Sequence, residues 1–482
     1  MLLTKFPNFF VPDELMNDTD EKDKAPELFS NGDNQKFLDI NDEPLINDLG
    51  EWVLSESDIE CIGIGAGILG CGGGGNPHLG KLMGKMAVRE GKTIRIITPE
   101  NLKRTIESKV ANQGKQCIGI PIAMMGAPLI MKEKLVSRET VKAIKCLHNL
   151  YDNGYCNGQL PSSFDKNIHK DEGTRYINNY NTVVNEVHSQ GSTFSDNYDM
   201  PVIVCFEIGG LNSMEPLLAS ADLGIPVLDA DGMGRAFPEM QMTTININGR
   251  PSYPAAISDD KGRNDIVLES VSAKSVENHL RNVAIEMGCS AGVGVSNLRF
   301  PQDFEALIPH SLSYAWRLGL AVLKSRQEKT SPIEAILKSS NGVLSIIGKI
   351  TDVSRETTGG FNRGFAKIEG TENFSKKKAT IEFQNENLIT RFGNKEDVND
   401  DRSSIVACVP DLISIVDSDT GEPIPTEDVR YGQRVTVLTL PCHPLLKTPE
   451  ALKVVGPHAF GYTDIEFKPC TSYIPMEPVA PK

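Results

Sequence analysis

From Asp58 to Asp231 the sequence alternates between apolar runs that are typical of buried strands and runs with the spacing of helices. IECIGIGAG and KQCIGIPIAMM have the character of strands, whereas SRETVKAIKCLHNLYDNG has the 3.6-residue periodicity of an amphipathic helix. Strands with nearly continuous Val and Ile are usually covered on both faces. The pattern therefore predicts an α/β domain of three layers around a mainly parallel sheet.

After about residue 340 the pattern changes to short strand-like runs separated by Gly, Asn, Asp and Pro turns. Such spacing is typical of a β-rich domain, either a sandwich or a barrel. We expect an acidic flexible tail at 1–54, the α/β domain at 55–339 and a β-rich, barrel-like domain at 340–475. The polar segment 157–197 is interpreted as a surface insertion, with an active-site lid as the alternative.

Composition excludes several classes of protein. The 49 basic and 64 acidic side chains give a net charge of −15, which argues against nucleic acid or an anionic membrane as the main partner. No apolar run reaches the roughly 18–20 residues of a membrane span, and the start of the chain lacks the apolar core of a secretory signal. The ten cysteines form no C-x-x-C pair. We therefore expect a cytoplasmic protein with no membrane or nucleic-acid partner.

A glycine-rich string lies between Gly63 and Gly80 and contains a formal G-x-G-x-x-G. A dinucleotide site would need a helix directly after this motif, but four more glycines precede the predicted helix at Pro77. The alternatives are a backbone-amide cradle for a small anion or a planar ring, or a purely structural turn. We assign the four consecutive glycines to substrate binding: Gly72, Gly73, Gly74 and Gly75.

Glu207 ends a predicted buried strand, the position at which α/β proteins place residues that contact ligands. A carboxylate after an apolar strand needs a partner, which favours a functional role. Asn212 follows at the start of the next predicted helix, where it would either cap the helix or bind substrate.

Four charged residues surround the end of the next strand. Asp229 and Asp231 point to opposite faces if the strand continues, but they share one crevice if the chain turns at Gly232. Arg235 could keep a carboxylate ionised or clamp an anion, and Glu239 adds a third acid. Two carboxylates in different environments can divide general acid and general base work, or hold one divalent metal ion. An acidic helix start is the structural alternative.

Asn385, Glu386 and Asn387 stand within a predicted strand of the β-rich domain, although strands disfavour such residues. We interpret them as structural, or as facing a domain interface or the active cleft.

The order of motifs is more specific than any one of them. GAGILGCGGGGNPHLGKLM, EIGGLNSMEPLLAS, GIPVLDADGMGRAFPEMQMTT, TTGGFNRGF and GPHAFGY follow one another as in the S-methyl-thiohydantoin desulfurase family, which the chain resembles from about residue 55 to 465. This family is associated with hydantoinase/oxoprolinase proteins. The resemblance implies an α/β three-layer domain, a β-barrel-like domain and a hydrolase of a five-membered cyclic amide or amidine ring. Its reaction would convert a methylthio-imidazolone and water to a hydantoin and methanethiol.

Our sequence-based hypothesis gives the matching residues roles in this reaction. Asp229 or Asp231 would act as the base on water, and the other carboxylate or Glu207 would hold ring nitrogen. Arg235 and the amides of 72–75 would stabilise charge. A metal-activated hydroxide is the competing route, although no cofactor is certain.

Two other function classes remain open, a non-catalytic partner of a hydantoinase/oxoprolinase and a nucleotide-binding oxidoreductase. We also expect a homo-oligomer.

Overall fold

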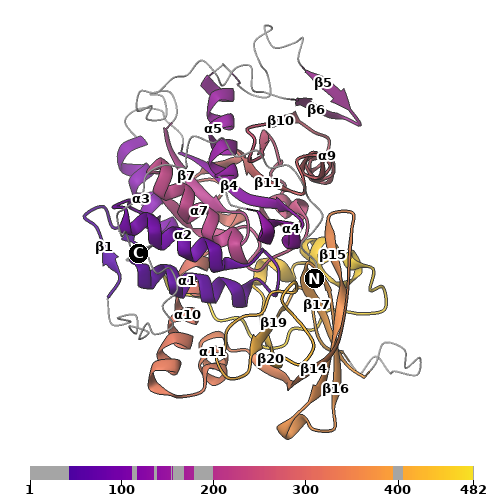
Figure 1. Cartoon of the computed structure of the whole chain (residues 1–482). Coiled ribbons are helices and arrows are strands. Elements are labelled where there is room, and N and C mark those ends of the chain that lie inside the picture. The colour runs from indigo at the N-terminus through magenta and orange to yellow at the C-terminus, as the bar shows by residue number, and fades with distance from the viewer. Residues whose placement is uncertain are drawn as a thin grey trace, which may run out of the picture. The chain divides into compact units, whose positions relative to one another are not determined.

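The computed structural model describes residues 43–110, 117–134, 138–152, 155, 168–178, 199–393 and 405–480. This part of the chain contains two sheets, a larger one near the N-terminal side of the sequence and a smaller one that begins at Val343 (Figure 1). None of its helices is long and apolar enough to cross a membrane.

The larger sheet has the strand order β1-β2-β3-β8-β7-β4-β11-β9-β10-β6-β5. Only the neighbours β3–β8, β8–β7 and β7–β4 are parallel. Helical crossovers join the strands of this central part, whereas β9 and β10 follow each other through a short turn and therefore pair antiparallel. The α/β class is confirmed, but the sheet is mixed rather than mainly parallel. Its strands are β1 (Leu45–Ile46), β2 (Trp52–Val53), β3 (Arg95–Ile97), β4 (Cys117–Gly126), β5 (His169–Asp171), β6 (Thr174–Ile177), β7 (Asp199–Cys205), β8 (Val227–Asp231), β9 (Ala255–Ser258), β10 (Asn264–Glu269), β11 (Ser290–Val295), β12 (Leu298–Phe300) and β13 (Ile308–Pro309).

Apolar side chains cover both faces of the central strands. Along β7, Ile203 and Cys205 belong to one buried cluster, and Val202 and Val204 belong to another. This alternation is what a strand between two layers requires, and it confirms the three-layer arrangement. The helices are α1 (Glu56–Leu69), α2 (Pro77–Arg89), α3 (Pro99–Val110), α4 (Pro128–Glu133), α5 (Glu139–Asp152), α7 (Gly210–Leu223), α8 (Thr244–Ile247), α9 (Ala273–Glu286), α10 (Ser311–Glu328), α11 (Pro332–Ser340) and α12 (Pro449–Val455).

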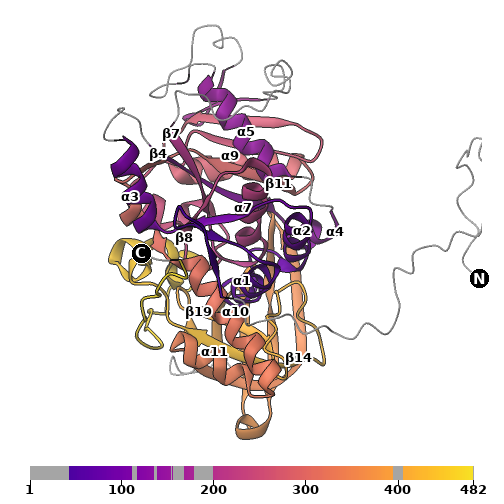
Figure 2. The ribbon, with the colours of Figure 1, turned by 90° about the vertical axis from the view of Figure 1, so that its left-hand side faces the viewer.

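The segment IECIGIGAG, expected to be a strand, lies within helix α1. A capping box between Ser55 and Asp58 starts this helix. Gly65 allows close packing against α10, because a Cβ there would lie 1.8 Å from the carbonyl oxygen of Ala315. Figure 2 shows the two helices side by side. The strand–turn–helix of a dinucleotide site is therefore absent at these described residues, and the oxidoreductase alternative loses the motif on which it rested.

The expected tail extends too far along the chain. Residues 43–54 include β1 and β2, and β2 pairs with β3. Trp52 is fully buried and packs edge to face against Trp316, with 5.8 Å between ring centroids. An aromatic side chain of this size anchors the segment to the core. Residues 1–42 lie outside the described residues.

Most of the expected insertion at 157–197 also lies outside the described residues. The part that is described, 168–178, forms the hairpin β5–β6, and β6 pairs with β10. This hairpin extends the edge of the sheet rather than forming a loop.

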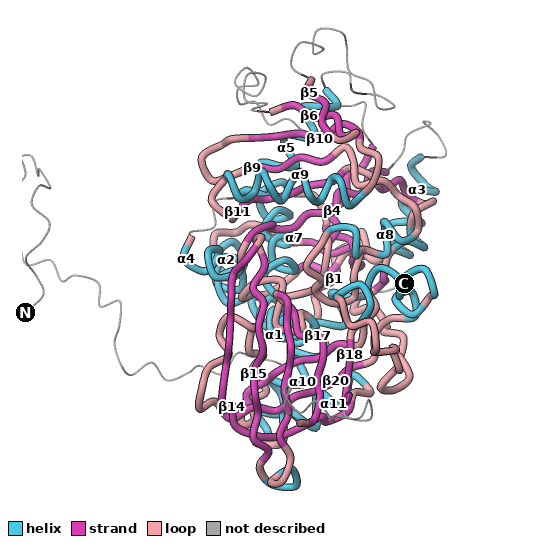
Figure 3. Tube along the Cα trace, turned by 90° about the vertical axis from the view of Figure 1, so that its right-hand side faces the viewer, coloured by secondary structure: helices cyan, strands magenta, loops and turns pink. Residues whose placement is uncertain are grey.

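The smaller sheet is antiparallel throughout, with the order β18-β17-β16-β15-β14-β20-β19, and it curls into a half-barrel. It confirms the β-rich, barrel-like fold expected for this half of the chain. Figure 3 shows its long hairpin β14–β15, which is separated from β17 by β16 in the strand order. Its strands are β14 (Val343–Thr358), β15 (Phe361–Gly370), β16 (Lys378–Gln384), β17 (Glu386–Phe392), β18 (Ile405–Cys408), β19 (Leu412–Asp417) and β20 (Arg434–Leu440).

Candidate active site

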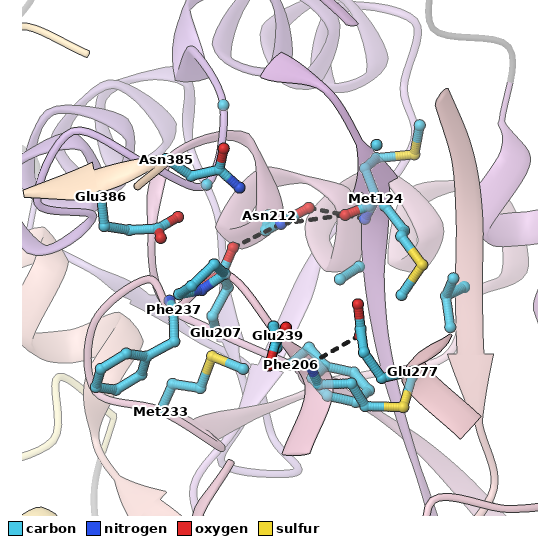
Figure 4. A pocket seen from close by; sticks show the side chains of 18 of the residues that line it. Met124, Phe206, Glu207, Asn212, Met233, Phe237, Glu239, Glu277, Asn385 and Glu386 are labelled. Atoms are coloured by element: carbon cyan, nitrogen blue, oxygen red, sulfur yellow. Dashed lines mark hydrogen bonds between the residues drawn. The ribbon is translucent and has the colours of Figure 1, made fainter. Parts of the chain in front are cut away.

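A pocket with about 640 Å³ of empty space, its open mouth included, lies where β7 ends and β17 begins. Apolar and sulfur-bearing side chains form much of its wall, and carboxyl and amide groups project into it (Figure 4). Such a mixture of an apolar wall and a few polar groups is typical of sites for small molecules. The lining consists of Gly74, Gly75, Ala123, Met124, Met125, Gly126, Met131, Phe206, Glu207, Asn212, Met233, Phe237, Pro238, Glu239, Met240, Glu277, Arg281, Val293, Asn385 and Glu386.

Glu207 lies two residues after β7 and is held in place by two hydrogen bonds. The side-chain amide of Asn212 donates to its Oε1 over 2.7 Å, and the backbone N–H of Phe237 donates to its Oε2 over 3.0 Å. Asn212 is itself fixed, because its Oδ1 accepts from the backbone N–H of Met124 in β4 over 2.8 Å. Burial raises the pKa of Glu207 to about 7, although the bond from Asn212 works in the opposite direction.

Glu386 is the first residue of β17 and reaches the same pocket from the smaller sheet. Burial raises the pKa of Glu386 well above its usual range, and the neighbouring charge of Glu207 raises it further. Gly73 makes room for this carboxyl group, because a Cβ there would lie 2.1 Å from Glu386 Oε1. Two carboxyl groups that share a buried space titrate as a coupled pair.

Asn385 precedes this carboxyl and has a left-handed backbone, with a φ of 59°. Its backbone N–H donates to the carbonyl oxygen of Asn362 over 2.7 Å, and its Oδ1 accepts from the N–H of Asn362 over 2.8 Å. This arrangement leaves the side-chain amide nitrogen of Asn385 without a hydrogen-bond partner among the described residues. Figure 4 shows this nitrogen on the side of Asn212.

The four consecutive glycines divide into two pairs. Only Gly74 and Gly75 line the pocket, and their carbonyl oxygens accept from the N–H groups of Asn212 and Leu211 over 3.1 and 3.0 Å. The loop thus satisfies the first turn of α7 and occupies its N-terminus. Gly72 and Gly73 pack instead against the C-terminal half of the chain, where a Cβ at Gly72 would lie 2.9 Å from Thr426.

Asp229 and Asp231 do not reach the pocket. Asp229 accepts from the backbone N–H and hydroxyl of Ser313 over 3.0 and 2.6 Å, at the start of α10.

Oδ2 of Asp231 accepts from three backbone N–H groups, those of Ile208, Met233 and Gly234. Burial raises the pKa of Asp231 to about 7 against the effect of these bonds. A shared crevice after a turn at Gly232 was one of the two alternatives, but both acids accept hydrogen bonds from backbone N–H groups outside the pocket lining.

Arg235 is fully buried and also lies outside the pocket. Its Nη1 donates to the carbonyl oxygen of Asp411 over 2.7 Å, and its Nη2 donates to that of Asn387 over 2.9 Å. Its guanidinium stacks 4.9 Å from the ring centre of Phe237. The side chain connects the loop after β8 to the smaller sheet, so it is not positioned to clamp a substrate anion as expected.

Helix α9 contributes residues that the sequence did not single out. Glu277 forms an ion pair with Arg281 at 2.7 Å, and its Oε2 accepts from the N–H of Met240 over 3.0 Å. A Glu–Arg pair four residues apart is ordinary on a helix surface, which is why it gave no signal. Glu239, which was expected in the site, lies in the pocket wall and pairs with Lys274 at 2.6 Å.

The pocket thus combines some of the predicted residues with others that were missed. Of the candidate residues named from the sequence, five line this pocket: Glu207, Asn212, Glu239, Gly74 and Gly75. The other predicted residues lie outside its lining: Asp229, Asp231, Arg235, Gly72 and Gly73. Glu386 was noticed as unusual in a strand, with a domain interface or the active cleft as alternatives to a structural role, but it was not assigned to the site. In the part of the chain that the structure describes, no group of three or more His, Cys, Asp or Glu side chains is arranged to hold a metal ion.

Comparison with protein families places this site in a known context. The N-terminal domain of S-Me-THD-like proteins matches residues 57–269, and their C-terminal domain matches residues 271–470. The chain belongs to the S-Me-THD-like family. This confirms the resemblance to the S-methyl-thiohydantoin desulfurase family that the motifs indicated.

A solved structure supports the same fold. The crystal structure of a structural-genomics protein from Chromobacterium violaceum is similar to this chain with a TM-score of 0.60 and 20% sequence identity, over 87% of this chain and 100% of that one. No curated protein matched the chain.

The two S-Me-THD-like domains meet within the pocket. Glu207 and Asn212 belong to the part matched by the N-terminal family model, whereas Glu277 and Glu386 belong to the part matched by the C-terminal one. Neither domain alone contains both buried carboxyl groups.

Proposed function

We propose that this S-Me-THD-like chain is a hydrolase that replaces the methylthio group of a 2-methylthio-imidazolone ring with an oxygen from water. The products are a hydantoin and methanethiol. The observation that carries the proposal is the buried pair Glu207 and Glu386 in a pocket walled by methionine and phenylalanine side chains. Two carboxyl groups with raised pKa values can serve as base and acid in one hydrolysis.

In the first step Glu207 acts as the base. Its ionised carboxylate takes a proton from water while the water oxygen bonds to the ring carbon that carries sulfur. Both carboxylate oxygens already accept one hydrogen bond, and each retains a second acceptor site for the water. Glu386 in its protonated form gives its proton to the adjacent ring nitrogen, so the C=N bond becomes single.

In the second step the tetrahedral carbon collapses. The new hydroxyl returns a proton to Glu386 as its oxygen becomes the carbonyl, the C–S bond breaks, and the thiolate takes the proton held by Glu207. Both glutamates are then restored, and the ring carries two N–H groups and two carbonyls. The side-chain amide of Asn385 is a suitable donor to the ring carbonyl that was present from the start.

The apolar wall suits the leaving group. Methionine sulfur and aromatic rings are soft, polarisable surfaces that pack well against a methylthio group. Met124, Met233, Phe206 and Phe237 supply such a surface beside Glu207.

The test is turnover of a 2-methylthio-imidazolone, with methanethiol measured by a thiol reagent and hydantoin by chromatography. Glu207→Gln and Glu386→Gln should each reduce kcat at least about 100-fold. Glu269→Gln is the matched control, because Glu269 is half exposed in β10, outside the pocket. A folded Glu207→Gln protein that turns over normally would remove Glu207 as the base.

Three further expectations remain proposals that their own measurements can test. Activity after exhaustive chelation tests the metal-activated route. Co-purification tests association with a hydantoinase/oxoprolinase protein, and light scattering tests the homo-oligomer.

A further inference from the structure

The sequence motif TTGGFNRGF forms the tip of the hairpin β14–β15, and the proposed mechanism gives this tip no role. Gly359 and Gly360 make the turn, with φ values of 59° and 80°, as a two-residue type I′ turn requires. In residues 352–358 the strand β14 pairs with β15 but with no other described strand. Because a two-stranded hairpin is marginally stable by itself, we expect contacts at the tip to help fix its position.

One side of the tip contacts helix α9. The guanidinium of Arg281 lies 4.7 Å from the ring centre of Phe361, which is the distance of a cation–π contact. A Cβ at Gly360 would lie 3.1 Å from Cδ of Arg281, whereas a Cβ at Gly359 would meet nothing within 4 Å. The tip therefore approaches α9 through Gly360 and Phe361.

This contact continues into the support of Glu207. Nη2 of Arg281 donates to the carbonyl oxygen of Pro238, in the pocket wall, over 2.9 Å. Pro238 directly follows Phe237, whose backbone N–H donates to Oε2 of Glu207 over 3.0 Å. The ring of Phe361 thus contacts a side chain that is bonded next to the group that holds Glu207.

The other side of the tip holds the strand that carries Glu386. Asn362 follows Phe361 and exchanges two hydrogen bonds with Asn385. The backbone N–H of Asn385 donates to the carbonyl oxygen of Asn362 over 2.7 Å, and the N–H of Asn362 donates to Oδ1 of Asn385 over 2.8 Å. Asn385 directly precedes Glu386, and both line the pocket. Two consecutive residues of the tip therefore connect to opposite walls of the site.

We propose that the hairpin tip is a positioning element of the active site, in which Phe361 fixes Asn385 and Glu386 relative to Glu207. Phe361 lies outside the pocket lining, so it acts through Arg281 and Asn362 rather than on the substrate. The inference rests on the proposed function for the chemistry of the two acids. Displacing a catalytic group by about 1 Å can lower a rate about 100-fold, so loss of this contact should affect the chemical step.

The experiment removes the ring and measures turnover of the 2-methylthio-imidazolone that the wild type converts best. Phe361→Ala should lower kcat at least about tenfold and leave KM within about threefold, because the ring does not touch substrate. Phe361→Tyr retains an aromatic face and should restore kcat to within about twofold. Normal kcat in folded Phe361→Ala, or a raised KM with normal kcat, would overturn the inference.

Two further variants make this comparison specific. Phe365→Ala is the matched control, because Phe365 lies in the same strand, 5.1 Å from the Lys367 ammonium and outside the pocket lining. Its kcat should stay within about twofold of the wild type. Phe361→Leu keeps apolar bulk but loses the aromatic face, and it should lower kcat at least about threefold even if the alanine variant does not fold. Equal losses in the Phe361 and Phe365 variants would overturn the inference.

Hydrogen exchange tests the same contact without any turnover. Phe361→Ala should speed exchange of the backbone amides of Asn385 and Phe237 at least about tenfold, whereas strand β11 should keep its wild-type rate. Phe365→Ala should change neither. Faster exchange in a protein whose wild type turns over no ring would support the positioning role and contradict the reaction. Unchanged exchange at both amides would overturn the inference, whatever the turnover.

Discussion

At the scale of single residues, lying at the end of a strand does not decide whether a carboxyl group lines the pocket. The direction of its side chain decides it. Glu207 and Asp231 both lie at strand ends, and burial raises the pKa of both to about 7. Glu207 faces the pocket, whereas Asp231 receives three backbone N–H groups. A raised pKa therefore identifies a buried carboxyl group, but only its surroundings indicate whether it can reach a substrate.

The buried pair should give turnover a characteristic dependence on pH. The base must be ionised, so kcat/KM should rise with pH through an apparent pKa near 7, and it should fall again where Glu386 loses its proton. Both apparent values belong to the pair rather than to one residue. Rate profiles from pH 5 to 10 would show this, and a flat profile between pH 5 and 8 would contradict it.

The same group should make stability depend on pH. The pKa of Glu207 rises from 4.5 to about 7 on folding, so its stabilising contribution is complete below about pH 4.5 and is lost as pH rises through 7. Glu207→Gln removes this loss. We expect the variant to gain on the order of 2 kcal/mol relative to the wild type between pH 5 and pH 8, measured by urea unfolding. A difference that is independent of pH would show that the carboxyl group titrates normally.

Asp231 should affect stability rather than the chemical step. Asp231→Asn weakens the charged acceptor of three backbone N–H groups, and we expect a loss of about 2–3 kcal/mol in the free energy of unfolding. The kcat of the folded fraction should stay within about tenfold of the wild type. Denaturant unfolding together with active-site-corrected turnover separates the two effects. A 100-fold loss of kcat at unchanged stability would restore Asp231 as the base.

At the scale of elements, helix α1 shows how a sequence pattern can mislead. Its Ile and Gly residues look like a buried strand because the helix is apolar almost all round and carries small residues where α10 crosses it. A helix buried on most sides loses the amphipathic period by which helices are usually identified. Gly319 meets α1 in the same way, since a Cβ there would lie 1.9 Å from the carbonyl oxygen of Cys61.

This packing predicts a large effect for a small substitution. Gly65→Ala should cost about 3 kcal/mol or more, because the added methyl group would overlap the backbone of Ala315 and force two helices apart. Gly84→Ala in α2 is the matched control. Its Cβ would lie 3.2 Å from a side-chain carbon of Ile59, so its effect should stay within about 1 kcal/mol. Thermal unfolding of both variants would test this, and equal losses would argue against close packing at Gly65.

At the scale of the whole described molecule, the pocket depends on contacts between the two sheets. Arg235 makes one of these contacts through the carbonyl oxygens of Asp411 and Asn387. Arg235→Lys loses the planar fork that places a separate nitrogen at each of the two carbonyl oxygens, so we expect a loss of about 2–4 kcal/mol in stability. Chemical unfolding would measure it. A variant with normal stability but a raised KM would instead support a direct contact with substrate.

Much of the fold could be predicted from the sequence, because the spacing of apolar residues indicates most of the strands and helices in their order along the chain. The antiparallel part of the large sheet was missed, because the positions of β9, β10 and β11 along the chain do not indicate which strands pair with them. The site was predicted in part. Strand ends identified Glu207, but Glu386 and Arg281 reach the pocket from the other domain, and only tertiary contacts bring them there.

Glu207 and Glu386 belong to different family domains, so the proposed acid–base pair exists only when the two domains are folded together. A chain cut between residues 269 and 271 would place Glu207 and Glu386 on different fragments. Neither fragment alone should release methanethiol, and activity should return only when the halves recombine. Turnover would then require both fragments at once, and its rate would measure how much of the two fragments has recombined into the folded protein.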